Sequence, residues 1–309
     1  GWCWLLLLRD GHRLVHGRHV LLRPRIRRLG FGRYFFADEG VSMLRAPGTV
    51  AKKTGFEVDT SSSYTTVCYA ISVELADELL DNSDAVWQLE KSSMELLTQL
   101  SMIRRERAFA TGFMATSVWN TNGDKAGSTD FTKWSDYGAS DPFTDLEDGI
   151  AGVGDAVGKD ANKLVMGNIV WRRLKHHPDF IDRISGGATS SSPALLTQQL
   201  LASFLGLDEI IVAKARYRSS AEGAATLTLA PIVDDDCLLL YAPRTAQLMT
   251  PTGGATFIWK TRAAGTAAPQ YIRRGVETRA GYVWIEVRQY FDQKVTERNA
   301  GWFISDCVD

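Results

Sequence analysis

Residues 162–184 read NKLVMGNIVWRRLKHHPDFIDRI and combine a buried strand with an amphipathic helix. The apolar run 164–166 has the length of a short strand, and Gly167 ends it. Asn168 is a helix-capping residue, and Pro178 closes the helix that it begins. The apolar side of this helix consists of Val170, Trp171 and Leu174. The stretch therefore predicts a strand that runs directly into a helix.

A second unit of the same kind follows along the chain. Ser192 as cap and Pro193 in the first turn predict a helix over residues 195–205, which ends at Gly206. The apolar segment 209–215 then reads as a strand. Two successive units of helix and strand predict an α/β layer.

The longest helical pattern runs from Asn82 to about Phe113, with Asn82 or Ser83 as its cap. Arg104, Arg105, Glu106 and Arg107 lie near its end, where positive charge suits the helix dipole. Its recurring apolar residues are Val86, Leu89, Leu96, Leu97, Leu100, Ile103 and Phe109. We expect one long, rod-like helix whose apolar face is buried.

A polar connection and another helix separate these regions. Residues 120–143 are rich in Gly, Asn, Ser and Asp and predict a loop anchored by Trp134 and Tyr137. A capping box of Thr144 and Glu147 then predicts a helix. The apolar face of that helix consists of Leu146, Ile150, Val153 and Val157.

The sequence predicts extended strands in two further regions, one before the long helix and one toward the end of the chain. Between residues 33 and 73, aromatic and β-branched runs are separated by the turn formers Gly40, Pro47, Gly48 and Gly55, which predicts a long hairpin. An isolated two-stranded ribbon is marginal in water, so we expect this one to lie on another surface. The later strands are expected over residues 226–233, 237–241, 256–259 and 282–288.

Composition bounds the class of protein. The 309 residues, 45% of them hydrophobic, can build one large domain or two ordinary ones. The net charge of −1 is uneven, because residues 1–33 hold eight arginines against Asp10 alone. Without them, the 27 basic and 35 acidic residues of the body give a net charge of −8. This acidic body argues against a protein whose main task is nucleic-acid binding.

The first thirty residues differ from the body in composition and show no persistent period. One interpretation is a flexible basic arm, and another is translation from a wrong start or frame. The apolar run 2–8 is too short to cross a bilayer and lacks a cleavage site, so we expect a soluble chain without a membrane span or signal peptide. The cysteines 3, 68, 237 and 307 form no CxxC pair, which fits a reducing cytoplasm.

Candidate catalytic and metal-binding patterns are incomplete, and we expect no enzyme, cofactor or metal. Gly152, Gly154 and Gly158 do not have the spacing of a phosphate-binding loop. A helix that ends at Gly158 explains this glycine-rich stretch better. His176 and His177 point about 100° apart on a helix and favour a helix-end role at the surface. The spacing of His12, His16 and His19 could place them on one metal-binding face. The acidic triplet of Asp234, Asp235 and Asp236 is expected to be a solvated turn. The hydroxyl residues Thr189, Ser190, Ser191 and Ser192 are expected to be loop and cap residues.

Several segments in a fixed order resemble tailed-bacteriophage major capsid proteins of the Hong Kong 97-type fold. They are RAPGT at 45–49, RRER at 104–107, NKLVMG with KHHPDFIDRI at 162–184, FLGLDEIIVAKARY at 204–217, LMTPTGG at 248–254 and YFDQKVTERNAGWFISD at 290–306. The resemblance implies an α+β chain. It divides the chain into an N-terminal arm (1–32), an E-loop hairpin with its adjoining strand (33–73), a P-domain with a spine helix (74–143), mostly A-domain (144–255) and strands returning to the P-domain (256–309).

The family's function is mechanical. The resemblance implies hexamers and pentamers that form an icosahedral virion shell around double-stranded DNA, assembled in the bacterial cytoplasm, with scaffold, portal and decoration proteins as partners and only non-specific contact with DNA. In some capsids of this fold a Lys–Asn isopeptide bond joins subunits, for which Lys52 and Lys53 are candidates here. The expected inter-subunit residues are Arg33, Tyr34, Phe36, Arg45, Lys52, Lys53, Phe56, Arg104, Arg105 and Arg107. The alternatives are an encapsulin-like compartment and a small-molecule hydrolase that uses the acidic triplet or His176.

Overall fold

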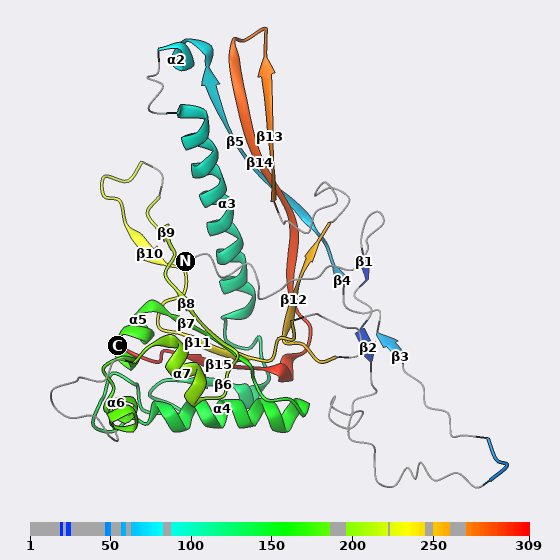
Figure 1. The fold of residues 1–309 in the computed structure, drawn as a ribbon, viewed down its shortest axis with the longest axis vertical. Coiled ribbons are helices and arrows are strands. Elements are labelled where there is room, and N and C mark those ends of the chain that lie inside the picture. Colours follow the sequence, from blue (N-terminus) through cyan, green and yellow to red (C-terminus); the bar gives the residue numbers. More distant parts are fainter. Residues whose placement is uncertain are drawn as a thin grey trace.

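The computed structural model describes residues 19–20, 23–25, 47–50, 57–59, 63–82, 88–185, 196–221, 223–244, 250–259 and 270–309. Figure 1 shows two parts: a sheet with its helices at one end, and an elongated sheet that rises from it beside one long helix. Both parts mix helices with sheets, as the α+β prediction requires.

The first part is built on a five-stranded sheet in the order β6-β15-β11-β7-β8. Its strands are β6 (Asp124–Ala126), β7 (Lys163–Gly167), β8 (Glu209–Ala213), β11 (Cys237–Leu240) and β15 (Gly301–Ser305). β7 and β8 pair in parallel, which confirms the predicted α/β layer, whereas β11 is antiparallel to both of its neighbours. The loop prediction for residues 120–143 missed β6 and the short 3-10 helix η2 (Thr121–Gly123).

Four helices accompany this sheet: α4 (Pro142–Val157), α5 (Asn168–Leu174), α6 (Pro178–Ser185) and α7 (Gln198–Phe204). Their apolar residues enclose one face of the sheet, and β7 is buried along its whole length. The predicted apolar sides are confirmed, since Ile150 is half-buried against the same cluster and the others are buried: Leu146, Val153, Val157, Val170, Trp171 and Leu174. Trp134 is fully buried as the predicted anchor of its loop, but Tyr137 is 37% exposed.

The helix starts differ from the sequence predictions. Asp141, not Thr144, caps α4: its Oδ1 accepts from the Thr144 N–H at 3.1 Å, and its Oδ2 accepts from the Thr144 hydroxyl at 2.7 Å. Pro142 in the first turn explains the earlier start, because its missing N–H costs nothing there. The end at Gly158 is confirmed, with φ at +74°.

Two further helix ends were misplaced. Gly167 occupies the cap position of α5, so Asn168 is the first helical residue rather than the cap. Pro178 opens α6, because a proline that cannot continue one helix suits the first position of the next. Thr197 caps α7 through the Leu200 N–H at 3.3 Å, and the predicted cap, Ser192 with Pro193, lies outside the described residues.

The elongated part has β14 (Tyr282–Val295) at its centre, paired with β5 (Val67–Ala76), β12 (Gly254–Ile258) and β13 (Gln270–Glu277). Helix α3 (Leu89–Phe113) lies along one face of this sheet. The Gln289 side-chain amide donates to the carbonyl oxygen of Ser101 at 3.0 Å, and the Ser101 hydroxyl donates to Gln270 Oε1 at 3.0 Å. Alternate β14 residues therefore face α3, as the period of two predicted.

The long helix begins later than predicted. Asn82 ends the short helix α2 (Asp77–Asp81), and Gln88, with φ at +39°, precedes α3. The predicted cap Ser83 and the apolar residue Val86 lie in 83–87, outside the described part of the chain. A left-handed residue cannot continue a helix, which explains why the predicted helix begins at Leu89 rather than at Asn82.

The remaining elements are short. β1 (His19–Val20) pairs with β4 (Ser63–Tyr64), and β2 (Arg23–Arg25) pairs with β3 (Glu57–Asp59). β9 (Arg216–Arg218) and β10 (Leu229–Pro231) form a hairpin, so the strand predicted over 226–233 is only three residues long. A 3-10 helix, η3 (Arg298–Ala300), precedes β15. Much of the hairpin predicted over 33–73 lies outside the described residues, but the turn predicted at Pro47 and Gly48 is described, and Gly48 has a φ of +80°.

Gly167 gives a test of the junction between β7 and α5. A Cβ atom at this position would lie 1.6 Å from the carbonyl oxygen of Asp234, a backbone atom that cannot rotate away. We expect Gly167→Ala to lower the free energy of unfolding by about 3 kcal/mol or more. Gly112→Ala on α3 is the matched control, since nothing lies within 4 Å of its Cβ position, and we expect it to stabilise by up to about 1 kcal/mol. Chemical denaturation of both variants measures the difference, and equal stabilities would contradict the assignment.

Candidate functional site

Of the ten predicted inter-subunit residues, three lie on α3: Arg104, Arg105 and Arg107. The other seven lie outside the described residues: Arg33, Tyr34, Phe36, Arg45, Lys52, Lys53 and Phe56. Their contacts with a neighbouring subunit, and any isopeptide bond through the two lysines, stay predictions.

The arginines on α3 connect this helix to other elements of its own chain. The guanidinium of Arg104 lies over the ring of Tyr69 in β5, 4.8 Å from its centroid. The guanidinium of Arg107 lies 4.3 Å from the ring centroid of Tyr217 in β9. Arg105 is half-buried, and burial lowers the pKa of its guanidinium to about 10. Such contacts stabilise by about 0.5–1 kcal/mol each at exposed sites, so Arg104 and Arg107 help to set the position of α3.

Exposed apolar side chains gather around the Arg104 contact. Leu96 and Leu100 on α3 are 56% and 40% exposed, although the helical period predicted them in the core. Leu97 is buried as predicted, and Ser101 rather than Leu100 takes the next buried position, because one step along a helix rotates a side chain by about 100°. Leu100 is one helical turn from Arg104, so it lies beside the Arg104–Tyr69 contact.

Strand β5 continues this exposed surface. Val67 and Ile71, two residues either side of Tyr69, are 48% and 38% exposed. Ile71 pairs with Val287 and Val67 with Phe291, so both project on the sheet face that α3 covers. We call Val67, Ile71, Leu96 and Leu100 the apolar flank. It is a surface suited to association rather than to chemistry.

His177 is buried, which corrects the prediction of a surface histidine. Its side chain is 0% exposed, its Nε2 lies 3.0 Å from Ser140 Oγ, and its Nδ1 lies 3.3 Å from Asp179 Oδ2. The ring of Tyr137 packs edge-on against it. Ser140 thus contacts His177, which in turn contacts Asp179, and this is the order of contacts in the catalytic triad of nucleophilic hydrolases.

The proton positions oppose that chemistry. The Ser140 hydroxyl donates to the carbonyl oxygen of Asp136 at 2.6 Å, so Oγ accepts from the Nε2–H of His177. Nδ1 then accepts from the Asp179 N–H at 3.3 Å. A general base must instead accept the serine proton at Nε2. The arrangement therefore joins the loop before α4 to the start of α6 and does not prepare a nucleophile.

The acidic triplet is partly buried rather than a solvated turn. Asp234 is exposed, but Asp235 and Asp236 are half-buried beside the chain end, where the Asp306 N–H donates to Asp236 Oδ1 at 3.3 Å. Burial raises the pKa of Asp236 to about 6, and the neighbouring Asp235 adds to the shift. The carbonyl oxygen of Asp235 accepts from the Cys307 N–H and that of Asp236 accepts from the Gly167 N–H, so the backbone of the triplet is held beside these two segments.

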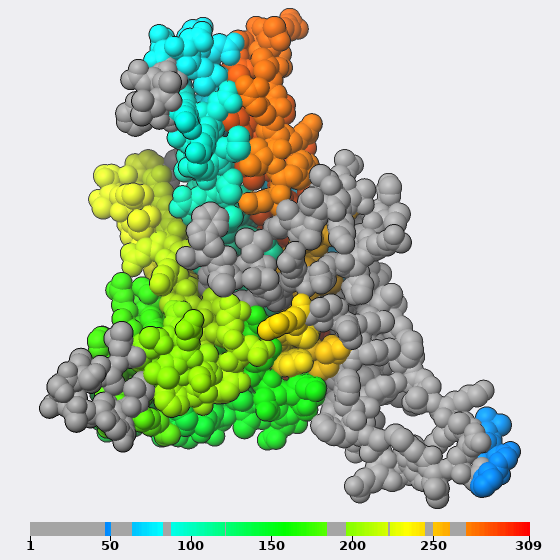
Figure 2. Space-filling model, viewed as in Figure 1, coloured from blue at the N-terminus to red at the C-terminus, as the bar shows by residue number. Residues whose placement is uncertain are grey.

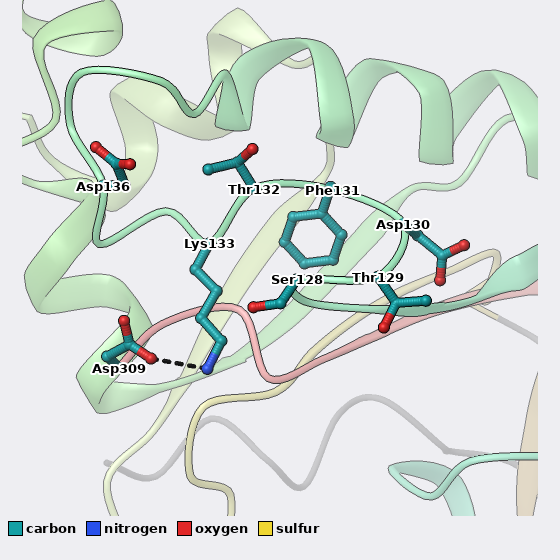
Figure 3. A pocket seen from close by; sticks show the side chains of 8 residues that line it. All are labelled: Ser128, Thr129, Asp130, Phe131, Thr132, Lys133, Asp136 and Asp309. Atoms are coloured by element: carbon teal, nitrogen blue, oxygen red, sulfur yellow. Dashed lines mark hydrogen bonds and ion pairs between the residues drawn. The ribbon is translucent and has the colours of Figure 1, made fainter.

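A polar cavity of about 560 Å³ lies near the last residues (Figure 3). Lys133 Nζ lies 2.8 Å from Asp306 Oδ1 and 2.7 Å from Asp309 Oδ1, and these hydrogen bonds raise its pKa. Its amine is therefore held as a cation by two carboxylates. The cavity is lined by Ser128, Thr129, Asp130, Phe131, Thr132, Lys133, Asp136 and Asp309.

The other candidate residues have structural surroundings where they are described. Gly152 lies within α4 against the Trp302 ring, which confirms the helix interpretation of the glycine-rich stretch. His176 is exposed, whereas His12, His16 and Thr189 to Ser192 lie outside the described residues, and so do the side-chain surroundings of His19. Within the described ranges, no three His, Cys, Asp or Glu side chains are grouped to hold a metal ion. None of the helices described is both long enough and apolar enough to cross a membrane.

Comparison with solved structures defines the fold. A phage-related protein from Bordetella bronchiseptica RB50 superposes with a TM-score of 0.70 at 18% identity, covering 97% of this chain and 90% of that one. Two further structures share this fold. A virus-like particle from Pyrococcus furiosus superposes with a TM-score of 0.54 at 13% identity, covering 98% of this chain and 92% of that one. The SrpI encapsulin from Synechococcus elongatus PCC 7942 superposes with a TM-score of 0.51 at 11% identity, covering 99% of this chain and 87% of that one. The chain has the Hong Kong 97-type fold.

A curated relative adds a sequence match. The chain is 25% identical over 173 residues to the major capsid protein of Burkholderia phage BcepMu, covering 55% of this chain and 53% of the relative. The chain thus matches about half the length of that protein. No family model matches the sequence. The resemblance to phage major capsid proteins predicted from the sequence is confirmed.

His177 makes the stability of this region depend on pH. Burial lowers its pKa, against the opposing effect of the Asp179 and Asp141 carboxylates. The unfolded chain therefore binds more protons, so the stabilisation is complete above a pH of about 6.5 and is lost as the pH falls through the folded-state pKa. Between pH 7 and 5, we expect the free energy of unfolding to fall more in the wild type than in His177→Gln.

The variant comparison is needed because Asp236, with its raised pKa, acts in the opposite direction below about pH 6. His176→Gln is the matched control, since His176 is exposed and should keep the wild-type pH dependence. Urea titrations at each pH measure the effect. Identical slopes for the His177 and His176 variants would contradict the assignment.

Proposed function

We propose that this chain is the major structural subunit of an icosahedral tailed-phage head, which self-assembles into hexamers and pentamers that enclose packaged double-stranded DNA. The match to a phage major capsid protein carries the proposal, and the shared fold at a TM-score of 0.70 supports it. The function is mechanical rather than catalytic. The protonation pattern of Ser140 and His177 gives no activated nucleophile at that site, and the hydrolase alternative through the acidic triplet or His176 stays a prediction.

The physical basis is association of identical subunits through unlike surfaces. Contacts of that kind form closed rings when the rotation closes, which gives hexamers and pentamers. Each interface needs to bury on the order of 1,000 Å² or more. Individually modest contacts allow misplaced subunits to dissociate, and many together make a stable shell.

The apolar flank supports this interpretation. Leu96 and Leu100 leave α3 with an exposed apolar stripe next to Val67 and Ile71 of β5. In an isolated subunit these groups stay in water, and burying one such side chain fully is worth about 1.5–3 kcal/mol. A neighbouring subunit, through the E-loop expected around residues 41–54, is the natural cover, since an extended ribbon gains stability by lying on another surface.

The same fold leaves an encapsulin-like compartment as the second candidate, because the Synechococcus elongatus encapsulin is a structural neighbour. Particle contents separate the two: a phage head holds DNA, and a compartment holds protein cargo. For the phage head we also propose a scaffold, a portal and a decoration protein as partners, non-specific contact with DNA, assembly in the bacterial cytoplasm, and no cofactor.

Removal of the expected E-loop tests assembly directly. We expect a chain lacking residues 41–54 to stay soluble and folded but to form no shells, because each subunit then loses the ribbon that overlaps its neighbour. Circular dichroism checks the fold, and electron microscopy of wild type and variant expressed with their neighbouring genes checks assembly. Shells of normal size from the shortened chain would refute this role.

The apolar flank gives an independent test. Leu96→Asp with Leu100→Asp should leave the melting temperature of the subunit within a few degrees of wild type, because both side chains are already exposed. Particle yield should fall at least about tenfold, since two carboxylates would have to be desolvated at an interface. Gln99→Asp, an exposed change on the same helix, is the matched control and should assemble normally. Normal yield from the double variant would contradict a buried flank.

A further inference from the structure

The β9–β10 hairpin projects from the five-stranded sheet alongside α3 (Figures 1 and 2). It follows β8 directly, and its base is fixed by the contact of Arg107 with Tyr217. The pairing of β9 with β10 is extended by two hydrogen bonds, from Ser219 N to Thr228 O at 2.9 Å and from Ile232 N to Ala215 O at 3.0 Å. The hairpin is therefore anchored at its base and paired along its length.

The described residues of its loop make further contacts. The Arg218 guanidinium donates to Ser220 Oγ at 3.1 Å and to the carbonyl oxygen of Ala221 at 3.0 Å. Gly223, with φ at +83°, takes the left-handed turn conformation that glycine favours. A loop whose shape is fixed before association loses less conformational freedom when it binds.

The hairpin presents a basic and apolar surface that the described part of its own chain leaves exposed. Leu227 and Leu229 are 63% and 50% exposed. Lys214 and Arg216 are exposed, and neither forms an ion pair within the described part of the chain. Over residues 214–231 the sequence holds three basic side chains and one acidic, a net charge of +2.

Helix α2, at the far end of the elongated sheet, has the complementary character. It reads DELLD, with Asp77, Glu78 and Asp81 all exposed and no basic residue in its last turn. Leu79 on the same helix is 54% exposed. Among the described residues, none of these three carboxylates has an ion-pair partner.

We propose that the β9–β10 hairpin of one subunit docks on α2 of a second copy of this chain, with Lys214 and Arg216 facing Glu78 and Asp81. Leu227 and Leu229 then lie against Leu79. The contact joins two different surfaces, so it is head-to-tail and extends from subunit to subunit. It rests on the proposed function, because only an assembly of copies brings the two surfaces together.

The partner follows from complementarity. A nucleic acid would suit the hairpin's positive charge but would leave two leucines against phosphate, and it would repel α2. A second copy matches both the charge and the exposed apolar groups. Opposite charges at the rim of such a contact orient the subunits and set the salt dependence of association.

Charge reversal tests the pairing. We expect Lys214→Glu with Arg216→Glu, and separately Glu78→Lys with Asp81→Lys, to lower particle yield at least about tenfold, because like charges then face each other. Arg218 stays in place so that the loop keeps its hydrogen bonds. Combining all four changes should restore the yield to within about threefold of wild type. Lys159→Glu, an exposed change at the end of α4, is the control and should change the yield less than about twofold.

The outcomes separate this inference from the proposed function. Melting curves first establish that each variant folds. If the wild-type chain forms no particles, the proposed function fails. If the wild type assembles and either reversed variant assembles as well, only the hairpin contact is overturned. Failure of the fourfold variant to recover, while each two-residue variant is defective and folded, also overturns the pairing, because the hairpin and α2 then touch different surfaces.

Discussion

Four buried side chains, Leu75, Leu97, Ile285 and Val287, hold α3 against the elongated sheet. Four half-buried apolar side chains, Val73, Leu80, Leu89 and Met94, pack around this small cluster. Polar contacts add to it: Ser101 with Gln289 and Gln270, and Arg274 with Glu90 at 2.8 Å. A single helix on one sheet cannot cover the sheet's whole face, so apolar groups of α3 and β5 stay exposed. The shape of the elongated part therefore depends on a narrow contact, and it leaves the surface that a neighbouring subunit is proposed to cover.

The five-stranded sheet is built differently. Its two faces are enclosed by separate apolar clusters, one with α4, α5 and α7 and the other with the end of α3, including Phe109 and Phe113. β11 lies between antiparallel neighbours at the centre, and its four residues are almost fully buried. This part has the core of an ordinary domain and can act as the rigid base from which α3 and the β9–β10 hairpin project.

The buried and half-buried polar groups of this base serve the fold. His177 and Ser140 connect the loop before α4 to α6, and Lys133 holds Asp306 and Asp309 at the chain's last residues. Each is satisfied mainly by a partner distant in sequence, which is how buried polar groups avoid a desolvation cost. Sequence reasoning named His177 but placed it at the surface, because its partner, Ser140, is 37 residues away and belongs to no motif.

The sequence by itself determined the elements whose pattern is local. The run at 164–166 with Gly167, the buried face of α5, and the alternation along β14 all follow from periods of 3.6 and 2. Only the tertiary structure decided that Leu97 and not Leu96 faces the sheet, that Asp141 caps α4, and that the hairpin and α2 expose complementary surfaces. The physical reason is that a period tells which side chains share a face, whereas burial depends on whether another element, or another subunit, is there to cover it.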